Sequence, residues 1–227
     1  MTTQEFFNQL DARIAKYDLL CHPFYKAWAA GQLTREDLRQ YGHEYYSHVE
    51  AFPEYLDEFA GRVGDSQLRR AVLANRNEEI GYEGSRSHAE LWLDFVEGMG
   101  GERENTESNV PEIGSLVNWF HSTASNGAPE EALAAFYAYE SQVPRVAAEK
   151  ARGLREMYGA DEKTCAYFTL HTTADVYHSR VWRRQLARIV EGNPQAADKA
   201  LNAGENAAKA LWNALDGIES ARMARAA

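Results

Sequence analysis

The octet His171-Thr172-Thr173-Ala174-Asp175-Val176-Tyr177-His178 constrains this chain more than any other stretch. On a helix it places two imidazoles and a carboxylate at i, i+4 and i+7, within about 60° of one another. Aromatic and aliphatic residues surround the octet, so we expect its helix to be buried. Buried His and Asp side chains must be hydrogen-bonded, paired or bound to a metal, because leaving them unsatisfied is costly. The octet therefore predicts either a polar network that joins helices or half of a metal site.

The hydrophobic pattern predicts an all-α fold. Apolar residues recur at helical spacing, and no convincing alternation typical of β-strands is present. Capping residues, prolines and glycines divide the pattern into about seven to nine helices, which we expect to pack as an antiparallel bundle. The expected helices cover roughly residues 2–16, 22–31, 34–59, 68–80, 88–98, 116–126 and 129–158, then one that carries the octet and ends near 192, and one over 196–218. A polar surface loop is expected at 101–111, and the tail is expected to fray from about residue 220.

The composition fits a single domain over residues 1–227. A chain of 227 residues, of which 44% are hydrophobic, can bury one substantial core. The formal charge of −10 argues against a nucleic-acid-binding surface, and no basic segment or long apolar run predicts attachment to a membrane. The two cysteines, Cys21 and Cys165, form neither a disulfide framework nor a zinc motif. We therefore expect a cytoplasmic protein whose partner is a small molecule or another protein.

Carboxylates and histidines on other apolar helices could complete a metal site with the octet. Glu140 is the strongest candidate, because it interrupts an aromatic and aliphatic run in which a lone acid is costly unless a cation neutralises it. A buried ion pair with Arg145 or Lys150 is the alternative explanation. Glu78 and His88, at the end of one helix and the start of the next, could close the set, although His88 alone could be an ordinary N-cap.

The complete set contains three carboxylates and three imidazoles. Its members are Glu78, His88, Glu140, His171, Asp175 and His178. This mixture lacks thiolates and suits iron or manganese better than structural zinc. Six protein ligands are too many for one ion with an open position, so the set predicts two ions. The Glu-x-x-His repeat of ferritin-like bundles is absent, since Ser141-Gln142-Val143 follows Glu140.

Several short motifs, in order along nearly the whole chain, resemble one family. They are Phe24-Tyr25, Tyr45-Tyr46, Ala51-Phe52-Pro53, Glu78-Glu79, His88-Ala89-Glu90-Leu91-Trp92, Tyr139-Glu140-Ser141-Gln142, Glu149-Lys150 and His171 to His178. With these residues the chain resembles the heme-oxygenase-like diiron oxidases, in particular the CADD-like 4-aminobenzoate synthases, and more distantly TenA and PqqC. The resemblance implies a compact heme-oxygenase-like helical bundle that holds two metal ions, Fe/Fe or Fe/Mn.

The resemblance also implies an unusual reaction. This is the O2-dependent synthesis of 4-aminobenzoate, a folate precursor, in which an external reductant takes part and the protein consumes its own side chains in a single turnover. The family's excised tyrosine falls on Tyr25, and its amine-donating lysine falls on Lys150. The alternative explanations are ordinary packing of Tyr25 beside Trp28 and a surface position for Lys150 with only its stem covered.

Two details stay open in the sequence. The segment Gly81 to Ser87 is a few residues longer than in the family, so the first carboxylate ligand could be Glu78, Glu79 or Glu83. Three further tyrosines could also be oxidised or relay electrons, namely Tyr41, Tyr45 and Tyr139.

Two other functions compete with the self-consuming synthase. The first keeps the dimetal site and oxidises an external small molecule, such as an amine or a fatty acid. The second is a protein-binding module of the CADD type with a death-domain partner, for which the sequence shows no apolar patch or charge run. A homodimer is compatible with all three.

Overall fold

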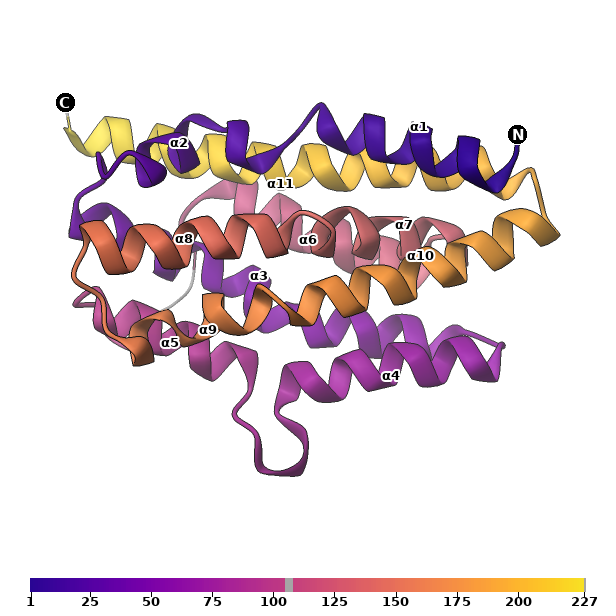
Figure 1. The fold of residues 1–227 in the computed structure, drawn as a ribbon, viewed down its shortest axis with the longest axis horizontal. Coiled ribbons are helices and arrows are strands. Elements are labelled where there is room, and N and C mark those ends of the chain that lie inside the picture. Colours follow the sequence, from indigo (N-terminus) through magenta and orange to yellow (C-terminus); the bar gives the residue numbers. More distant parts are fainter. Residues whose placement is uncertain (105–107, 227) are drawn as a thin grey trace.

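The computed structural model describes residues 1–104 and 108–226, so positions 105–107 of the expected loop at 101–111 lie outside the described residues. The predicted all-α class is confirmed, because every regular element in the described residues is helical (Figure 1). The α-helices are α1 Thr3–Ala15, α2 Pro23–Ala29, α3 Arg35–Arg62, α4 Ser66–Ile80, α5 His88–Gly98, α6 Pro111–Asn126, α7 Pro129–Glu140, α8 Val143–Met157, α9 Glu162–His171, α10 Ala174–Gly192 and α11 Ala196–Ala226. Two short 3-10 turns, Leu19–Cys21 and Tyr82–Gly84, precede α2 and α5. Within the described residues, no helix combines the length and the apolar character needed to cross a bilayer.

The helices pack along one another around an aromatic core. The longest helix, α11, lies beside α1 on one side of the bundle, while α4 and α5 lie on the opposite side and are joined by a protruding loop (Figure 1). Helix α3 packs against α4, α5 and α6, and α10 packs against α7. Capping boxes at Thr2, Thr34 and Ser87 fix the starts of α1, α3 and α5. The first turns of α1, α3 and α5 are therefore fixed by residues that are close to them in the sequence.

The octet lies on two helices, so its predicted placement on one helix is wrong. Helix α9 ends at His171, and α10 begins at Ala174. The Thr172 hydroxyl donates to the Thr169 carbonyl at 2.7 Å, and the Thr173 hydroxyl donates to the Leu170 carbonyl at 3.2 Å. These side-chain donors compete with the backbone for helix carbonyls, which explains the break.

The helix predicted over residues 129–158 is also divided. Helix α7 ends at Glu140 and α8 begins at Val143. Pro144 has no N–H to donate to the Glu140 carbonyl, so the α-helical ladder cannot continue through this point. At the end of the chain, α11 continues to Ala226 instead of fraying from about residue 220. Burial of Ile218 and an ion pair between Glu219 and Arg222 stabilise this extension.

Candidate metal centre

Carboxylates and imidazoles from five helices meet in one buried cluster. Two groups of three have possible ligand atoms within 4.8 Å of one another: Glu79, His88 and His171, and Glu79, Glu140 and His178. Glu79 belongs to both groups. Asp175 completes the cluster, because its Oδ1 lies 3.4 Å from His178 Nδ1 and it lines the same cavity as Glu79 and Glu140. The two groups share Glu79, so the cluster offers candidate ligand atoms on both sides of this carboxylate.

The structure brings Glu79 into this cluster and leaves Glu78 and Glu83 outside it. Glu79 is only 6% exposed, whereas the Glu78 side chain is 53% exposed and Glu83 lies on the exposed turn after α4. The helical phase explains the choice, because Glu79 continues a buried stripe on α4. Spaced four, three and four residues apart, this stripe is Leu68, Val72, Asn75 and Glu79.

Hydrogen bonds orient two of the imidazoles. His171 Nδ1 donates to the Tyr167 carbonyl at 2.7 Å, which leaves Nε2 free for a metal. His178 Nε2 donates to Glu78 Oε2 at 3.0 Å, which leaves Nδ1 facing Glu140 and Asp175. Glu78 therefore positions an imidazole from outside the cluster.

Two neutral donors hold the Glu140 carboxylate. Asn75 Nδ2 donates to Oε1 at 2.8 Å, and the Trp182 indole N–H donates to Oε2. All three side chains are almost completely buried. Arg145, one of the expected ion-pair partners, instead contacts Asp18. Hydrogen bonds thus fix Glu140 in the core. Among the described residues, no Arg or Lys side chain lies at ion-pair distance from its carboxylate.

Burial and neighbouring charges shift the pKa values of the side chains in the cluster. Burial raises the pKa of Asp175 to about 7 and lowers the pKa of His171 to about 4. Burial alone would lower the pKa of His178, but Asp175 and Glu140 raise it to about 12. His88 Nδ1 and His178 Nδ1 are buried without a hydrogen bond, although Glu79 Oε2 lies 2.7 Å from the former. Imidazole nitrogens beside three buried carboxylates therefore make this cluster a candidate metal-binding site.

A second buried polar group lies next to the cluster. Lys150 Nζ on α8 donates to Tyr25 Oη at 2.8 Å and to Tyr41 Oη at 2.6 Å, and the two phenol oxygens lie 3.0 Å apart. Lys150 is only 6% exposed and Tyr25 is 4% exposed, so the ordinary surface position considered for Lys150 is wrong. We call Tyr25, Tyr41 and Lys150 the amine–phenol group.

The Lys150 amine is favoured in its neutral form. Its burial lowers its pKa well below the ordinary value of 10.5. In the described part of the chain no carboxylate lies within 4 Å of Nζ, and aromatic rings surround it. Burial also raises the pKa of Tyr25 and Tyr41, so both phenols stay protonated. The group therefore places a buried amine, whose pKa is lowered toward the neutral form, against a phenol.

Two small cavities accompany these groups. The cavity at the metal cluster measures about 10 Å³, and the one at the amine–phenol group measures about 20 Å³. Tyr139 and Tyr167 line both, so these two side chains stand between the cluster and the amine–phenol group. Each cavity has room for one molecule the size of water or O2.

Comparison with known proteins identifies the family. A model described as "Iron-containing redox enzyme" matches residues 39–212. A 4-aminobenzoate synthase from Chlamydia trachomatis is 36% identical over 219 residues, which cover 93% of this chain and 90% of the relative. A 4-aminobenzoate synthase from Nitrosomonas europaea is 36% identical over 230 residues, which cover 96% and 92%. This chain belongs to the family of iron-containing redox enzymes.

Solved structures confirm the heme-oxygenase-like fold of this redox enzyme. A TenA homologue from Pseudomonas syringae superposes with a TM-score of 0.78 at 19% identity, covering 96% of this chain and 92% of the homologue. A CADD-like protein from Nostoc punctiforme superposes with a TM-score of 0.77 at 17% identity, covering 95% and 98%. The predicted resemblance to the TenA and CADD-like proteins is therefore confirmed for the fold.

Sequence reasoning missed three side chains of the redox centre. Asn75 and Trp182 hold Glu140, and Tyr167 both orients His171 and lies between the two cavities. The spacing of Asn75, four residues before Glu79 on an apolar stripe, was a signal that would have found it. No sequence signal pairs Trp182 with Glu140, because this contact joins residues 42 positions apart in the chain.

Proposed function

We propose that this redox enzyme is a dimetal 4-aminobenzoate synthase that consumes its own Tyr25 and Lys150 side chains. The observation that carries the proposal is the contact of the buried Lys150 amine with the Tyr25 hydroxyl at 2.8 Å, beside a cavity of about 20 Å³. This contact would bring the ring and the nitrogen of the proposed product together. The names of the relatives from Chlamydia trachomatis and Nitrosomonas europaea support the synthesis of 4-aminobenzoate.

We assign the metal ligands from the cluster. They are Glu79, which replaces Glu78 in the expected set, with His88, Glu140, His171, Asp175 and His178. These residues would hold two ions, Fe/Fe or Fe/Mn, which supply the one-electron chemistry needed to use O2. The shared position of Glu79 suits a bridging carboxylate. Glu78 acts through His178 by fixing its orientation.

The side chains themselves account for every heavy atom of the product except the oxygens. The Tyr25 ring supplies the six ring carbons and its Cβ supplies the carboxylate carbon. The Cα–Cβ bond breaks, Cβ takes up the two oxygens of O2, and Cα keeps a hydrogen in its place. The Lys150 nitrogen replaces the phenolic oxygen, which leaves as water. The Cε–Nζ bond breaks, and Cε becomes an aldehyde as O2 takes up its two electrons. Tyr41 holds both reacting groups, because its hydroxyl contacts Lys150 Nζ and Tyr25 Oη. Burial excludes bulk water from all three.

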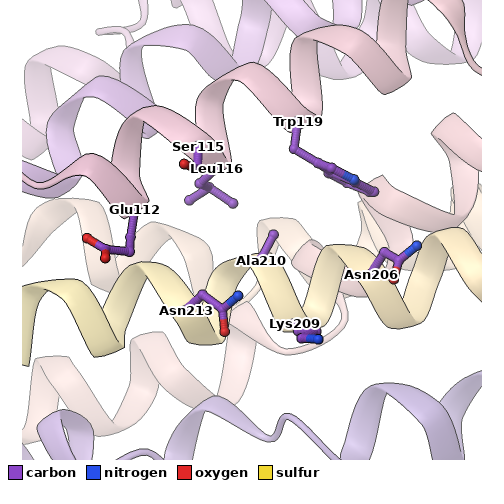
Figure 2. Close-up of a pocket in the computed structure, with 8 residues that line it drawn as sticks. All are labelled: Glu112, Ser115, Leu116, Trp119, Asn206, Lys209, Ala210 and Asn213. Atoms are coloured by element: carbon purple, nitrogen blue, oxygen red, sulfur yellow. The ribbon is translucent and has the colours of Figure 1, made fainter.

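The cavity sizes disfavour an external substrate. Sites for small organic molecules usually measure about 300–1,000 Å³, far more than the 10 and 20 Å³ at the two groups. A pocket of about 330 Å³ does open between α6 and α11, with Trp119 and Leu116 facing Ala210 (Figure 2). None of the proposed ligands or reacting residues lines it. A molecule bound there would not reach the cluster, so the internal tyrosine is the better substrate.

Isotope labelling tests the proposal directly. The chain is produced with ring-labelled tyrosine and with [15N-ε]lysine, loaded with Fe(II) or with Fe(II) and Mn(II), and exposed to air with a chemical reductant. We expect 4-aminobenzoate with both labels, together with a mass loss that peptide mapping assigns to Tyr25 and Lys150. Labelled protein that stays intact while unlabelled product accumulates would reject the internal substrate.

Variants separate the metal site from the reacting groups. His171→Ala is expected to abolish both metal binding and product formation, because it removes a ligand that no neighbour replaces. Tyr25→Phe is expected to abolish product and keep both ions, since Tyr25 lies in the amine–phenol group, outside the ligand set. Metal analysis and rescue of cells that lack 4-aminobenzoate synthesis measure the two effects. Normal rescue by Tyr25→Phe contradicts the assignment of Tyr25.

A further inference from the structure

The small cavities raise the question of how electrons reach the buried cluster. The proposed function, on which this inference rests, consumes electrons from outside the chain. A cavity of about 10 Å³ cannot admit an organic reductant such as a nicotinamide or a flavin. Electrons from an organic reductant must therefore pass through the protein from its surface, and a protein carrier can supply them there. The surface beside the cluster should show where this carrier binds.

Two side chains that reach solvent adjoin the cluster at His178, namely the Glu78 carboxylate, which accepts a hydrogen bond from it, and Tyr177. The Tyr177 side chain is 63% exposed, and its ring centroid lies 6.1 Å from that of His178, a proposed ligand. The Tyr177–His178 contact is thus a short connection between solvent and the cluster.

Arginines continue from Tyr177 along the outer face of α10. Tyr177, Arg180, Arg184 and Arg188 occur at i, i+3, i+7 and i+11, which places them within an arc of about 80° on the helix. We call these four residues the arginine stripe. Its members are all exposed. Arg188 pairs with Asp65, whereas Arg180 and Arg184 have no carboxylate within 4 Å among the described residues. Their charges are available to a partner.

The segments around the cluster also expose apolar side chains. Seven large hydrophobic residues are exposed in the described chain, and four of them belong to the segments that flank the proposed ligands. These four are Ile80 and Tyr82, just after Glu79, and Leu170 and Tyr177, on either side of the break between α9 and α10. Exposed apolar side chains in the segments that carry the proposed ligands, together with the unpaired Arg180 and Arg184, are features of a docking surface for another protein.

The charge pattern indicates the chemistry of that partner. The chain as a whole carries a formal charge of −10, yet α10 carries four arginines against Glu191 and the buried Asp175. An acidic protein is repelled by most of the surface and attracted to the arginine stripe, so it would approach in one orientation. We propose that the arginine stripe, with the apolar residues at its end, docks an acidic one-electron carrier protein that reduces the cluster through Tyr177 and His178. Each docking event oxidises the carrier by one electron and reduces the metal centre by one electron, and no atom is transferred.

Binding to an acidic carrier tests this surface. The probe is a plant-type [2Fe–2S] ferredoxin, titrated into the metal-loaded full chain at low ionic strength and followed by calorimetry. The double variant Arg180→Glu/Arg184→Glu is expected to weaken binding by about tenfold or more, and added salt is expected to weaken binding of the wild type. The matched control is Lys199→Glu/Lys209→Glu on α11, which also lowers the formal charge by four but leaves the stripe intact. This control is expected to bind nearly as the wild type does.

Electron transfer gives a second measurement. The metal-loaded chain is first oxidised to the ferric state with ferricyanide, without O2, and then freed of this oxidant. Stopped-flow oxidation of reduced ferredoxin by this chain is expected to slow by about tenfold or more in the stripe variant. Tyr177→Ala is expected to slow the transfer more than it weakens binding. Dithionite is expected to reduce the metal centre equally in all variants, because this small ion needs no docking surface.

Several outcomes would overturn the docking proposal. They are an absence of ferredoxin binding at low ionic strength, equal binding by the stripe variant and the α11 control, and salt-sensitive self-association that the stripe variant abolishes. The last result would assign the surface to a second copy of the chain. Failure of 4-aminobenzoate synthesis is a separate result, because binding and anaerobic electron transfer are measured without product.

Discussion

The two buried polar groups of this enzyme lie side by side but handle charge in opposite ways. In the metal cluster, three carboxylates and three imidazoles from α4, α5, α7, α9 and α10 face one another. In the amine–phenol group, a single amine from α8 meets phenols from α2 and α3, with no carboxylate at ion-pair distance among the described residues. Tyr139 and Tyr167 line both cavities.

This contrast shows how one core can support two kinds of chemistry. Carboxylates at close range attract cations, which lowers the cost of burying their charge. The amine among aromatic rings has no carboxylate at ion-pair distance in the described residues, and burial lowers its pKa toward the neutral form. One core can therefore contain a candidate metal site and a buried amine of lowered pKa, because the carboxylates lie in the first group and, among the described residues, none is at ion-pair distance from the second.

The largest expected effect concerns the metal side of this comparison. Glu79→Gln is expected to lose at least one of the two ions, because Glu79 belongs to both groups of possible ligands. Glu78→Gln is the matched control on the neighbouring residue. It is expected to keep both ions but to bind them about 10–100-fold more weakly, because Glu78 orients His178. Metal analysis after iron loading measures the difference. Equal metal content and affinity in the two variants would contradict the assignment of Glu79.

An intermediate effect concerns the amine side. The lowered pKa of Lys150 means that the unfolded chain binds one more proton than the folded chain, between that lowered pKa and the ordinary 10.5. The free energy of unfolding should therefore rise with pH across this window, with Lys150 contributing about 1.4 kcal/mol per pH unit. Lys150→Met is expected to remove this contribution and to be more stable than the wild type near neutral pH. Urea unfolding at several pH values measures it.

The control for this experiment is Lys26→Met, which removes an exposed lysine. It is expected to keep the pH dependence of the wild type. If Lys150→Met and Lys26→Met show the same slope, Lys150 is charged in the folded protein, and the contrast between the two buried groups disappears.

The smallest expected effect tests the link between Tyr41 and the amine. Tyr41→Phe removes the hydroxyl that contacts both Lys150 Nζ and Tyr25 Oη, so it is expected to cost about 1–2 kcal/mol of unfolding free energy without changing metal content. Tyr55→Phe is the control, because Tyr55 is equally buried but its hydroxyl makes only a 3.4 Å contact with His48. A larger loss in Tyr55→Phe would show that Tyr41 contributes little to holding the amine.

Local patterns in the sequence predicted the helices and the chemical types of the donor set. The capping boxes at Thr2 and Thr34 and the proline at the start of α7 act within one turn, so their effects are visible in the chain itself. The burial of Glu79 rather than Glu78 could also have been predicted from the sequence, because Glu79 continues the buried stripe of α4. The break after His171 was harder to predict, because threonine side chains compete with the backbone only weakly.

The sequence by itself determined an all-helical chain with acids, imidazoles, a tyrosine and a lysine at the positions of the proposed reaction. Only the tertiary structure decided that Lys150 is buried against Tyr25, 125 residues away in the chain. It also decided that no carboxylate of the described residues lies at ion-pair distance from this amine. The same holds for the contact of Trp182 with Glu140. The physical reason is that desolvation and pairing depend on groups brought together from distant helices, and the pKa of a side chain follows these neighbours and not its position in the sequence.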